Sequence, residues 1–296
     1  MPESFDANYK NLLGRVMSRG KWSNSRAGRT KRLFAEYLEV DNLMDGFPIL
    51  TLRKLHPKGI FGELAAFISG TTQLQTFKDY GCNYWSANAA AWVLNKDVHP
   101  MDHLVGQSYG YQWRHWPAND LVRGYDQLRT LVCGIRCNPE GRRHILLSYN
   151  PSASSCLPAC YLSAQYFVDG AFLDCCVTMR SVDLILGLPS DVVLHATLQH
   201  LLALECNLIP RRLVFNLGDT HIYESHMDGA HELMRRWLPP VRWARNPSER
   251  VSGVSRCDVP HIVLHEAACL FNFHPDQVEL INYEPQPAIS GLALNV

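Results

Sequence analysis

One stretch near the middle of the chain, LPACYLSAQYFVDGAFLDCCVTMRSVDLILGLPSDV (residues 157–192), decides the fold. Within it, Tyr161–Val168 and Ala171–Met179 are runs rich in aromatic and β-branched residues, which predict two strands. Asp169-Gly170 between them is a two-residue hairpin signal, because glycine readily adopts the positive φ that such turns need. The stretch therefore predicts two adjacent antiparallel strands.

Helical patterns surround this hairpin. Apolar residues recur at helical spacing in three segments: Tyr9–Met17, Ile60–Ile68 (ending at Gly70) and Val192–Cys206. Two further apolar runs predict strands: His144–Ser148 and Leu213–Leu217. The polar run Asn24–Arg32 predicts a loop, and Tyr84–Gly106 predicts an irregular segment. No repeat or linker divides the chain, so we expect one α+β domain over residues 1–296.

Composition limits the possible functions. Hydrophobic residues make up 47% of the 296 residues and the net charge is zero, so nucleic-acid binding has no electrostatic support as the main role. The N-terminus lacks a signal pattern, and no apolar run approaches membrane-spanning length, so we expect a cytoplasmic protein without a membrane segment. None of the ten cysteines has a zinc-ligand spacing, so we expect reduced thiols and no metal.

Cys160 is a candidate nucleophile, because nearby positive charge can lower the pKa of a thiol. Four arginines could supply that charge or bind phosphate oxygens with their planar forks: Arg26, Arg142, Arg143 and Arg180. The alternatives are a buried strand cysteine and arginines that are simply solvated at the surface.

Two other polar features stand out. Glu63 lies within the apolar helical pattern, where burial would raise its pKa and suit proton transfer, although it could equally be a boundary or surface residue. LGDTHIYESH (residues 217–226) follows a strand, and polar groups at a strand end often line a site. A hydrogen-bonding role for His221 and Tyr223 fits this pattern better than a zinc site built from His221 and His226.

Taken together, six motifs resemble those of the thymidylate synthase family, in the family's order from about Tyr9 to Pro287. They are DGFPILTLRKLH (45–56), GELAAFISGTT (62–72), SYGYQWRHW (108–116), RRHILLSYNP (142–151), the stretch at 157–192 and LGDTHIYESH (217–226). The resemblance implies a thymidylate synthase-like α+β domain with a central mixed sheet flanked by helices. It also implies a homodimer formed through that sheet.

The resemblance further implies a mechanism in which Cys160 attacks C6 of a pyrimidine 5′-monophosphate. The activated C5 then takes up the one-carbon unit of 5,10-methylenetetrahydrofolate. Implied phosphate contacts are Arg26, Arg180 and Ser181, together with Arg142 and Arg143 reaching across from the other subunit.

Other roles follow from the same resemblance. Glu63 would transfer protons through ordered water, and Tyr109 would lie beside the nucleophile. His221 and Tyr223 would contact the sugar 3′-hydroxyl, and Asp183 would lie between substrate and folate. The remaining folate contacts would be Trp85, Leu186, Gly187 and the C-terminal tail Leu292–Val296.

Four positions depart from the family pattern. Tyr161 replaces a histidine, Asn88 a tryptophan, Ser190 a phenylalanine and Asp191 an asparagine. An aspartate can accept the N4–H of cytosine, whereas its ionised form would face the O4 acceptor of uracil. The phage deoxycytidylate hydroxymethylases of the family carry aspartate at the matching place, so the exchange predicts a cytosine base.

The fate of the one-carbon unit is the second choice. Asn88 and Ser190 would make the folate side more polar and roomier, which favours the addition of water over hydride transfer. The sequence thus predicts a dCMP hydroxymethylase, working in the host cytoplasm if phage-encoded, whose product is used either in phage DNA modification or in a small natural product. The alternatives are a methylating synthase acting on dCMP or dUMP, a CMP hydroxymethylase, and a non-enzymatic messenger-RNA-binding role.

Overall fold

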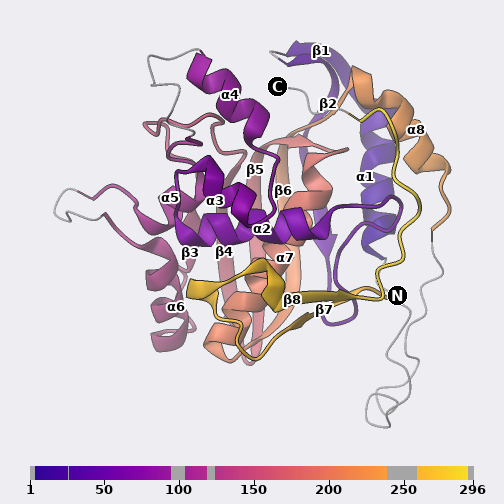
Figure 1. Ribbon diagram of the computed structural model, residues 1–296. Helices are drawn as coiled ribbons and strands as arrows, with labels where there is room; N and C mark the ends of the chain where they lie inside the picture. Colours follow the sequence, from indigo (N-terminus) through magenta and orange to yellow (C-terminus); the bar gives the residue numbers. More distant parts are fainter. Residues whose placement is uncertain (1–3, 26, 95–103, 119–123, 239–258, 293–296) are drawn as a thin grey trace, which may run out of the picture.

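The computed structural model describes residues 4–25, 27–94, 104–118, 124–238 and 259–292. Figure 1 shows a central sheet with helices packed around it and a short two-stranded sheet near the bottom of the view. The main sheet has six strands in the order β1-β2-β6-β5-β4-β3, and its β5–β6 pair is parallel while the other pairs are antiparallel. The expected α+β fold with a mixed sheet flanked by helices is confirmed.

The strands of the main sheet are β1 (Lys21–Ser25), β2 (Gly28–Val40), β3 (Ile145–Leu147), β4 (Tyr161–Asp169), β5 (Phe172–Asp183) and β6 (Ile209–Tyr223). The small sheet pairs β7 (His261–Leu264) with β8 (Val278–Ile281). The helices are α1 (Phe5–Arg19), α2 (Pro57–Ser69), α3 (Leu74–Asp79), α4 (Ser86–Leu94), α5 (Tyr109–Arg114), α6 (Gln127–Cys137), α7 (Gly187–Cys206) and α8 (Met227–Arg235). Short 3₁₀ turns in the described part of the chain are Glu224–His226, Leu270–Asn272 and Pro275–Gln277.

Helix α7 lies at the centre of the core. It is apolar around most of its circumference, which is typical of a buried helix, and Leu194, Leu198 and Leu202 are at most 1% exposed. It packs against β5, β6 and α2. A continuous buried cluster extends from α7 to α1, where Tyr9 is fully buried. That one domain spans residues 1–296 stays a prediction.

The local signals at α2 act as expected. Pro57 occupies the first turn, where a missing N–H costs no helical hydrogen bond. The helix ends at Gly70, whose φ of 72° is the left-handed conformation that closes many helices. These two residues fix the length of the helix that carries Glu63.

Several expected boundaries were wrong. Asn24–Arg32 is not a loop but part of the β1–β2 hairpin, and a large part of the supposed irregular segment Tyr84–Gly106 is helix α4. The hairpin between β4 and β5 turns at Gly170-Ala171, one residue later than expected, since Asp169 pairs with Phe172. Helix α7 begins at Gly187, so Asp191 is a helical residue and not a loop residue.

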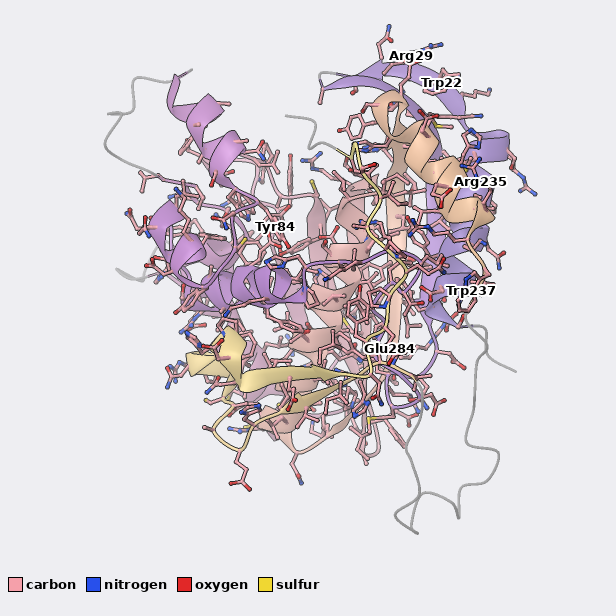
Figure 2. The ribbon with its side chains drawn as sticks, turned by 45° about the vertical axis from the view of Figure 1, so that its right-hand side comes forward. Trp22, Arg29, Tyr84, Arg235, Trp237 and Glu284 are labelled. Atoms are coloured by element: carbon pink, nitrogen blue, oxygen red, sulfur yellow. The ribbon has the colours of Figure 1, made fainter. Side chains whose placement is uncertain are left out.

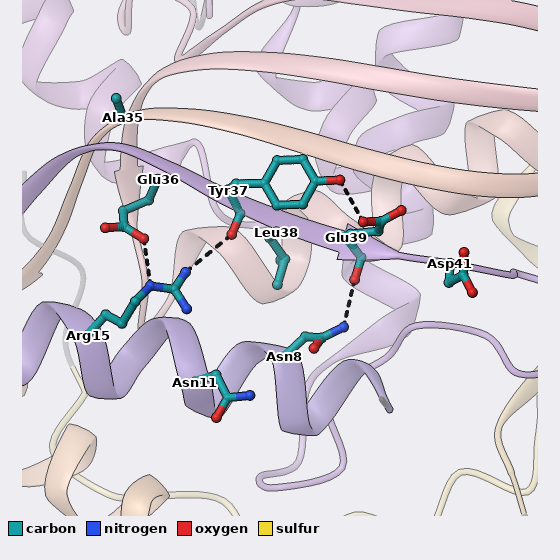
Figure 3. Close-up of a pocket in the computed structure, with 9 residues that line it drawn as sticks. All are labelled: Asn8, Asn11, Arg15, Ala35, Glu36, Tyr37, Leu38, Glu39 and Asp41. Atoms are coloured by element: carbon teal, nitrogen blue, oxygen red, sulfur yellow. Dashed lines mark hydrogen bonds and ion pairs between the residues drawn. The ribbon is translucent and has the colours of Figure 1, made fainter. Parts of the chain in front are cut away.

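Side chains from α1 protect the outer edge of β2 (Figure 3). Asn8 Nδ2 donates to the carbonyl of Glu39 at 3.0 Å, and Arg15 Nη2 donates to that of Tyr37 at 3.4 Å. Arg15 also pairs with Glu36 at 2.8 Å. Unpaired strand edges invite association with other strands, and these bonds occupy the carbonyls of this edge. The groove of about 680 Å³ between α1 and β2 is therefore lined by groups that already bond one another.

Within the described residues, one face of the sheet is not covered by helices. Opposite partners in the register place Ile145, Leu147, Gln165 and Phe167 on that face, together with Cys176, Val214 and Tyr37. Phe167 is 60% exposed and Tyr37 is 43% exposed. We refer to these seven residues as the open sheet face.

Among the described residues, no helix has the length and apolar character that crossing a bilayer requires.

Candidate active site

Cys160 lies directly before β4 and is fixed by backbone hydrogen bonds. Its N–H donates to Tyr109 Oη at 2.7 Å, and its carbonyl accepts the N–H of Arg180 at 2.8 Å. The Arg180 side chain folds back on the same segment, with Nε and Nη2 each 2.8 Å from the carbonyls of Ala159 and Pro158. The nucleophile segment is therefore held between α5 and β5.

The electrostatic surroundings of the thiol are mixed. Burial raises the pKa of Cys160, the positive charge of Arg180 and a hydrogen bond from Tyr109 lower it, and the negative charge of Asp191 raises it. The net direction is upward from an ordinary value of 9.0, so the thiol of the free protein is mostly protonated near neutral pH. Arg180 is thus the main group that favours the thiolate.

Glu63 faces the same region from α2. Trp85 Nε1 donates to Glu63 Oε1 at 2.7 Å, and the indole packs among Phe77 and Tyr109 with ring centroids 5.6 and 5.9 Å away. Burial raises the pKa of Glu63 to about 7, and the Trp85 hydrogen bond opposes that rise. A carboxyl that titrates near neutral pH can both accept and donate a proton during a reaction.

Asp183, Gly187 and Asp191 follow one another at four-residue intervals where β5 leads into α7. Asp183 Oδ1 accepts the N–H groups of Ile185 and Leu186 at 2.9 and 3.4 Å, which stabilises the turn between β5 and α7. A Cβ on Gly187 would lie 3.6 Å from Asp183 Cβ and 3.7 Å from Asp191 Oδ2. Gly187 therefore lies next to both acidic side chains.

The carboxyl of Asp191 is strongly perturbed. Burial raises its pKa well above 3.8, and the negative charges of Glu63 and Asp183 raise it further. Neutral Asp191 has one O–H donor and one carbonyl acceptor, which is the pattern of an edge-recognition group. The structure thus brings Cys160, Tyr109, Glu63 and Asp191 together.

Strands β5 and β6 run parallel and deliver a second set of residues to the same end of the sheet. Ser181 pairs with Asp219 in the register, and Asp183 pairs with His221. The His221 ring meets Tyr223 edge-on at 5.1 Å, and its Nδ1 lies 3.2 Å from Asp219 Oδ1. The end of a parallel strand pair is a common place for ligand binding.

The β1–β2 hairpin is attached to the same end of β6. Arg29 lies over the Trp22 ring at 4.7 Å, at the top of the view in Figure 2, and pairs with Glu224 at 2.8 Å. Arg32 pairs with Asp219 at 2.7 Å. Arg26, expected to bind phosphate, lies outside the described residues, but the strands that flank it are anchored beside the residues from β6.

Two expected site residues lie away from Cys160 within one chain. Arg142 and Arg143 are exposed and precede β3, the edge strand. Leu147 pairs with Ser163 and Ile145 with Gln165, so the arginines lie beyond the end of β3 that is farther from Cys160. Within one chain they are not part of the cluster around Cys160. Val296, expected at the folate, lies outside the described residues.

Sequence reasoning missed two supports of the site. Tyr9 Oη donates to the carbonyl of Leu184 at 2.8 Å, and Arg53 Nη2 donates to that of Ile185 at 2.6 Å, so both hold the turn that carries Asp183. Arg53 is within the motif at 45–56, but its partner could not be inferred from spacing. Tyr161 is stacked on Tyr109 with ring centroids 4.1 Å apart, which supports the tyrosine beside Cys160.

In the described part of the chain, no three His, Cys, Asp or Glu side chains are arranged to hold a metal ion.

Comparison with known proteins gives a clear match. The family model for thymidylate synthase matches residues 7–293. Thymidylate synthases of three Coxiella burnetii strains (Dugway 5J108-111, RSA 331 / Henzerling II and RSA 493 / Nine Mile phase I) are each 32% identical over 289 residues, covering 96% of this chain and 97% of the relative.

Proposed function

The chain belongs to the thymidylate synthase family, and from that premise we propose that it acts as a deoxycytidylate 5-hydroxymethyltransferase. The family transfers a one-carbon unit to a pyrimidine nucleotide, with 5,10-methylenetetrahydrofolate as co-substrate. In the proposed reaction dCMP, methylenetetrahydrofolate and water give 5-hydroxymethyl-dCMP and tetrahydrofolate.

The buried carboxyl of Asp191, close to Cys160 and Glu63, is the observation that carries the substrate assignment. Cytosine presents an N3 acceptor and an N4–H donor, which neutral Asp191 matches with its O–H and its carbonyl oxygen. Uracil presents N3–H and O4, which a neutral carboxyl can also pair with, so the discrimination against uracil depends on the ionised form of Asp191, which would place an acceptor against O4. Unpaired buried polar groups of this kind allow strong discrimination between substrates.

The other roles follow from the geometry around Cys160. The thiolate would add to C6 of the base, with Arg180 offsetting its charge and binding the 5′-phosphate together with Ser181. A guanidinium has five N–H donors, so two bonds to carbonyls leave donors for phosphate. Glu63 would exchange protons with the base through water, and His221 and Tyr223 would bind the sugar.

The residues on the folate side fit a planar heterocycle with N–H donors. Asp183 uses one oxygen to accept the Ile185 N–H in the turn before α7, and its carboxylate retains acceptor capacity for a ring N–H. Leu186 and Gly187 lie beside it, and Trp85, the residue directly before α4, closes the region. Bound methylenetetrahydrofolate would supply the carbon that is transferred.

Water addition has support from two polar residues on this side. Asn88 and Ser190 are half-buried, and Ser190 Oγ lies 3.4 Å from the carbonyl of Leu186. Polar side chains can hold water where the folate would otherwise be packed against aromatic rings. This supports hydroxymethylation over hydride transfer.

A homodimer through the open sheet face is part of the proposal. Exposed apolar side chains there, including Phe167 at 60% and Leu147 at 40%, would be buried by a second copy. Arg142 and Arg143 lie at one end of this face, where they could reach the phosphate site of the partner. The cytoplasmic location and the link to phage DNA stay predictions.

The second candidate is a C5-methylating synthase that acts on dCMP or dUMP. Its support is that the similar proteins of C. burnetii bear the name thymidylate synthase. A CMP hydroxymethylase is a third possibility. Ser181, which matches the deoxynucleotide enzymes of the family, favours dCMP over CMP.

One product assay distinguishes these candidates. The enzyme is incubated with methylenetetrahydrofolate and, in parallel, dCMP, CMP or dUMP, and both products are identified by mass spectrometry. The proposal expects 5-hydroxymethyl-dCMP with tetrahydrofolate, and water labelled with ¹⁸O should appear in the product. Dihydrofolate and a methylated base would instead establish the second candidate.

A further inference from the structure

Two exposed cysteines face one another on the solvent side of α6, apart from the proposed active site. Cys133 and Cys137 are one helical turn apart, and their Sγ atoms are 3.8 Å from each other. The buried side of the same helix consists of Leu128, Leu131, Val132 and Ile135. The thiols therefore have no packing role in the core, and the proposed reaction does not use them.

The distance between the two sulfur atoms matches the distance between two thiolate ligands of one metal ion. Two thiolates bound to one tetrahedral centre with arms of about 2.3 Å lie about 3.8 Å apart, which is the edge of that tetrahedron. A direct disulfide fits less well, because Cβ atoms at this helical spacing are about 5–6 Å apart and a disulfide needs roughly 3.5–4.5 Å. The helix thus presents two sulfurs at the spacing of a chelate.

We propose that Cys133 and Cys137 form a two-thiol binding site for a soft, thiophilic ion or a trivalent arsenical. A divalent ion such as Cd²⁺ or Zn²⁺ would displace both thiol protons, and water would complete its coordination. An aryl arsenoxide would react without any change of oxidation state. Its As=O bond is replaced by two As–S bonds, and the oxygen leaves as water with the two thiol protons.

Ligation has to displace the protons of both thiols. Cys137 shares a hydrogen bond with Cys133, which raises the pKa of Cys137, while the adjacent Arg136 lowers it. The 3.8 Å contact between the two Sγ atoms places each sulfur within hydrogen-bond distance of the other. Because a dithiol chelates a trivalent arsenical with two bonds, an excess of monothiol should not remove the arsenical, whereas it should remove one bound to a lone cysteine.

The test uses phenylarsine oxide with the full-length reduced protein, in excess 2-mercaptoethanol, followed by intact mass spectrometry. We expect one phenylarsenic adduct per chain, and its loss in both Cys133→Ser and Cys137→Ser. Cys176→Ser is the matched control and should keep the adduct. Cys175 and Cys176 are adjacent in sequence but occupy opposite faces of β5, so they cannot chelate one ion.

A titration with Cd²⁺ gives a second readout, in which each single variant should bind at least about tenfold more weakly than the unmodified protein. Both substitutions are at the helix surface and should leave the fold intact. Absence of a monothiol-resistant adduct would overturn the proposal, and so would an adduct that persists in Cys133→Ser. Neither readout depends on turnover, so the outcome is independent of the proposed function.

Discussion

Trp85 Nε1 donates a 2.7 Å hydrogen bond to Glu63 Oε1, and this bond tunes the acid that the proposed reaction needs. The pKa of Glu63 is raised to about 7 by burial, and the indole N–H limits that rise because it stabilises the carboxylate. Trp85→Phe should therefore shift the Glu63 titration upward by roughly one pH unit. The measurement is the pH dependence of kcat, in which the limb set by Glu63 should move to higher pH.

Trp113→Phe is the control for this shift. Trp113 Nε1 donates to Ser148 Oγ at 2.9 Å, so the substitution also removes a buried indole bond but leaves Glu63 untouched. An equal displacement of the limb in both variants would mean that general loosening of the core, and not the hydrogen bond to Glu63, causes it.

Asp191→Asn should change which base is accepted. An amide offers a donor to O4 and an acceptor to N3–H, so the preference for dCMP over dUMP should fall by roughly 100-fold or more in the ratio of kcat/KM. Asp183→Asn is the matched control, because it makes the same exchange at the neighbouring acid at the end of β5. It should weaken folate binding without altering the base preference. If Asp191→Asn leaves the preference unchanged, the cytosine assignment fails.

Arg180→Met should slow alkylation of Cys160. Because the guanidinium lowers the thiol pKa, its removal leaves less thiolate at a given pH, and the rate with iodoacetamide at pH 8 should fall about three- to tenfold. Peptide mass spectrometry follows Cys160 specifically. Arg180→Lys keeps the charge and should lose less reactivity, so an equal loss in both variants would point to the carbonyl anchors at Pro158 and Ala159 instead.

Periodicity predicted the elements that have one buried and one exposed face. It failed at β1, whose residues are exposed or half-buried on both faces, because a solvated arm has no alternation to detect. It also placed the start of α7 too late, since Gly-Leu-Pro-Ser is typical of a turn. Pro189 is tolerated there because the first N–H groups of a helix have no partner within it.

The residue types of the site could be predicted, but their mutual arrangement could not. Glu63 stood out as an acid in an apolar helix, yet its bond to Trp85, 22 residues away, depends on how the segment before α4 packs against α2. Asp191 stood out as a departure from the family pattern. Its raised pKa reflects Glu63 and Asp183, which approach it only in the folded chain.

Asp6 should make the protein less stable as pH rises. The residue is 5% exposed in the first turn of α1 and accepts hydrogen bonds from the N–H and hydroxyl of Thr51. Burial raises its pKa from 3.8 to about 6, so folding favours the protonated form. The stabilising contribution is fully present below pH 3.8 and is lost as pH rises through about 6, by about 3 kcal/mol for a shift of roughly two units.

Asp6→Asn removes that pH dependence, because the amide stays neutral and still accepts the Thr51 N–H. The variant should match the unmodified protein near pH 4 and exceed its unfolding free energy by about 1–2 kcal/mol above pH 7, after allowance for a weaker bond to the hydroxyl. Urea unfolding at a series of pH values measures the difference. Thr51→Val should act in the opposite direction, since the carboxylate then loses a donor and its ionisation costs more. If the difference in unfolding free energy between Asp6→Asn and the unmodified protein is constant across this pH range, the pKa of Asp6 is the same in the folded and unfolded states, and the prediction is wrong.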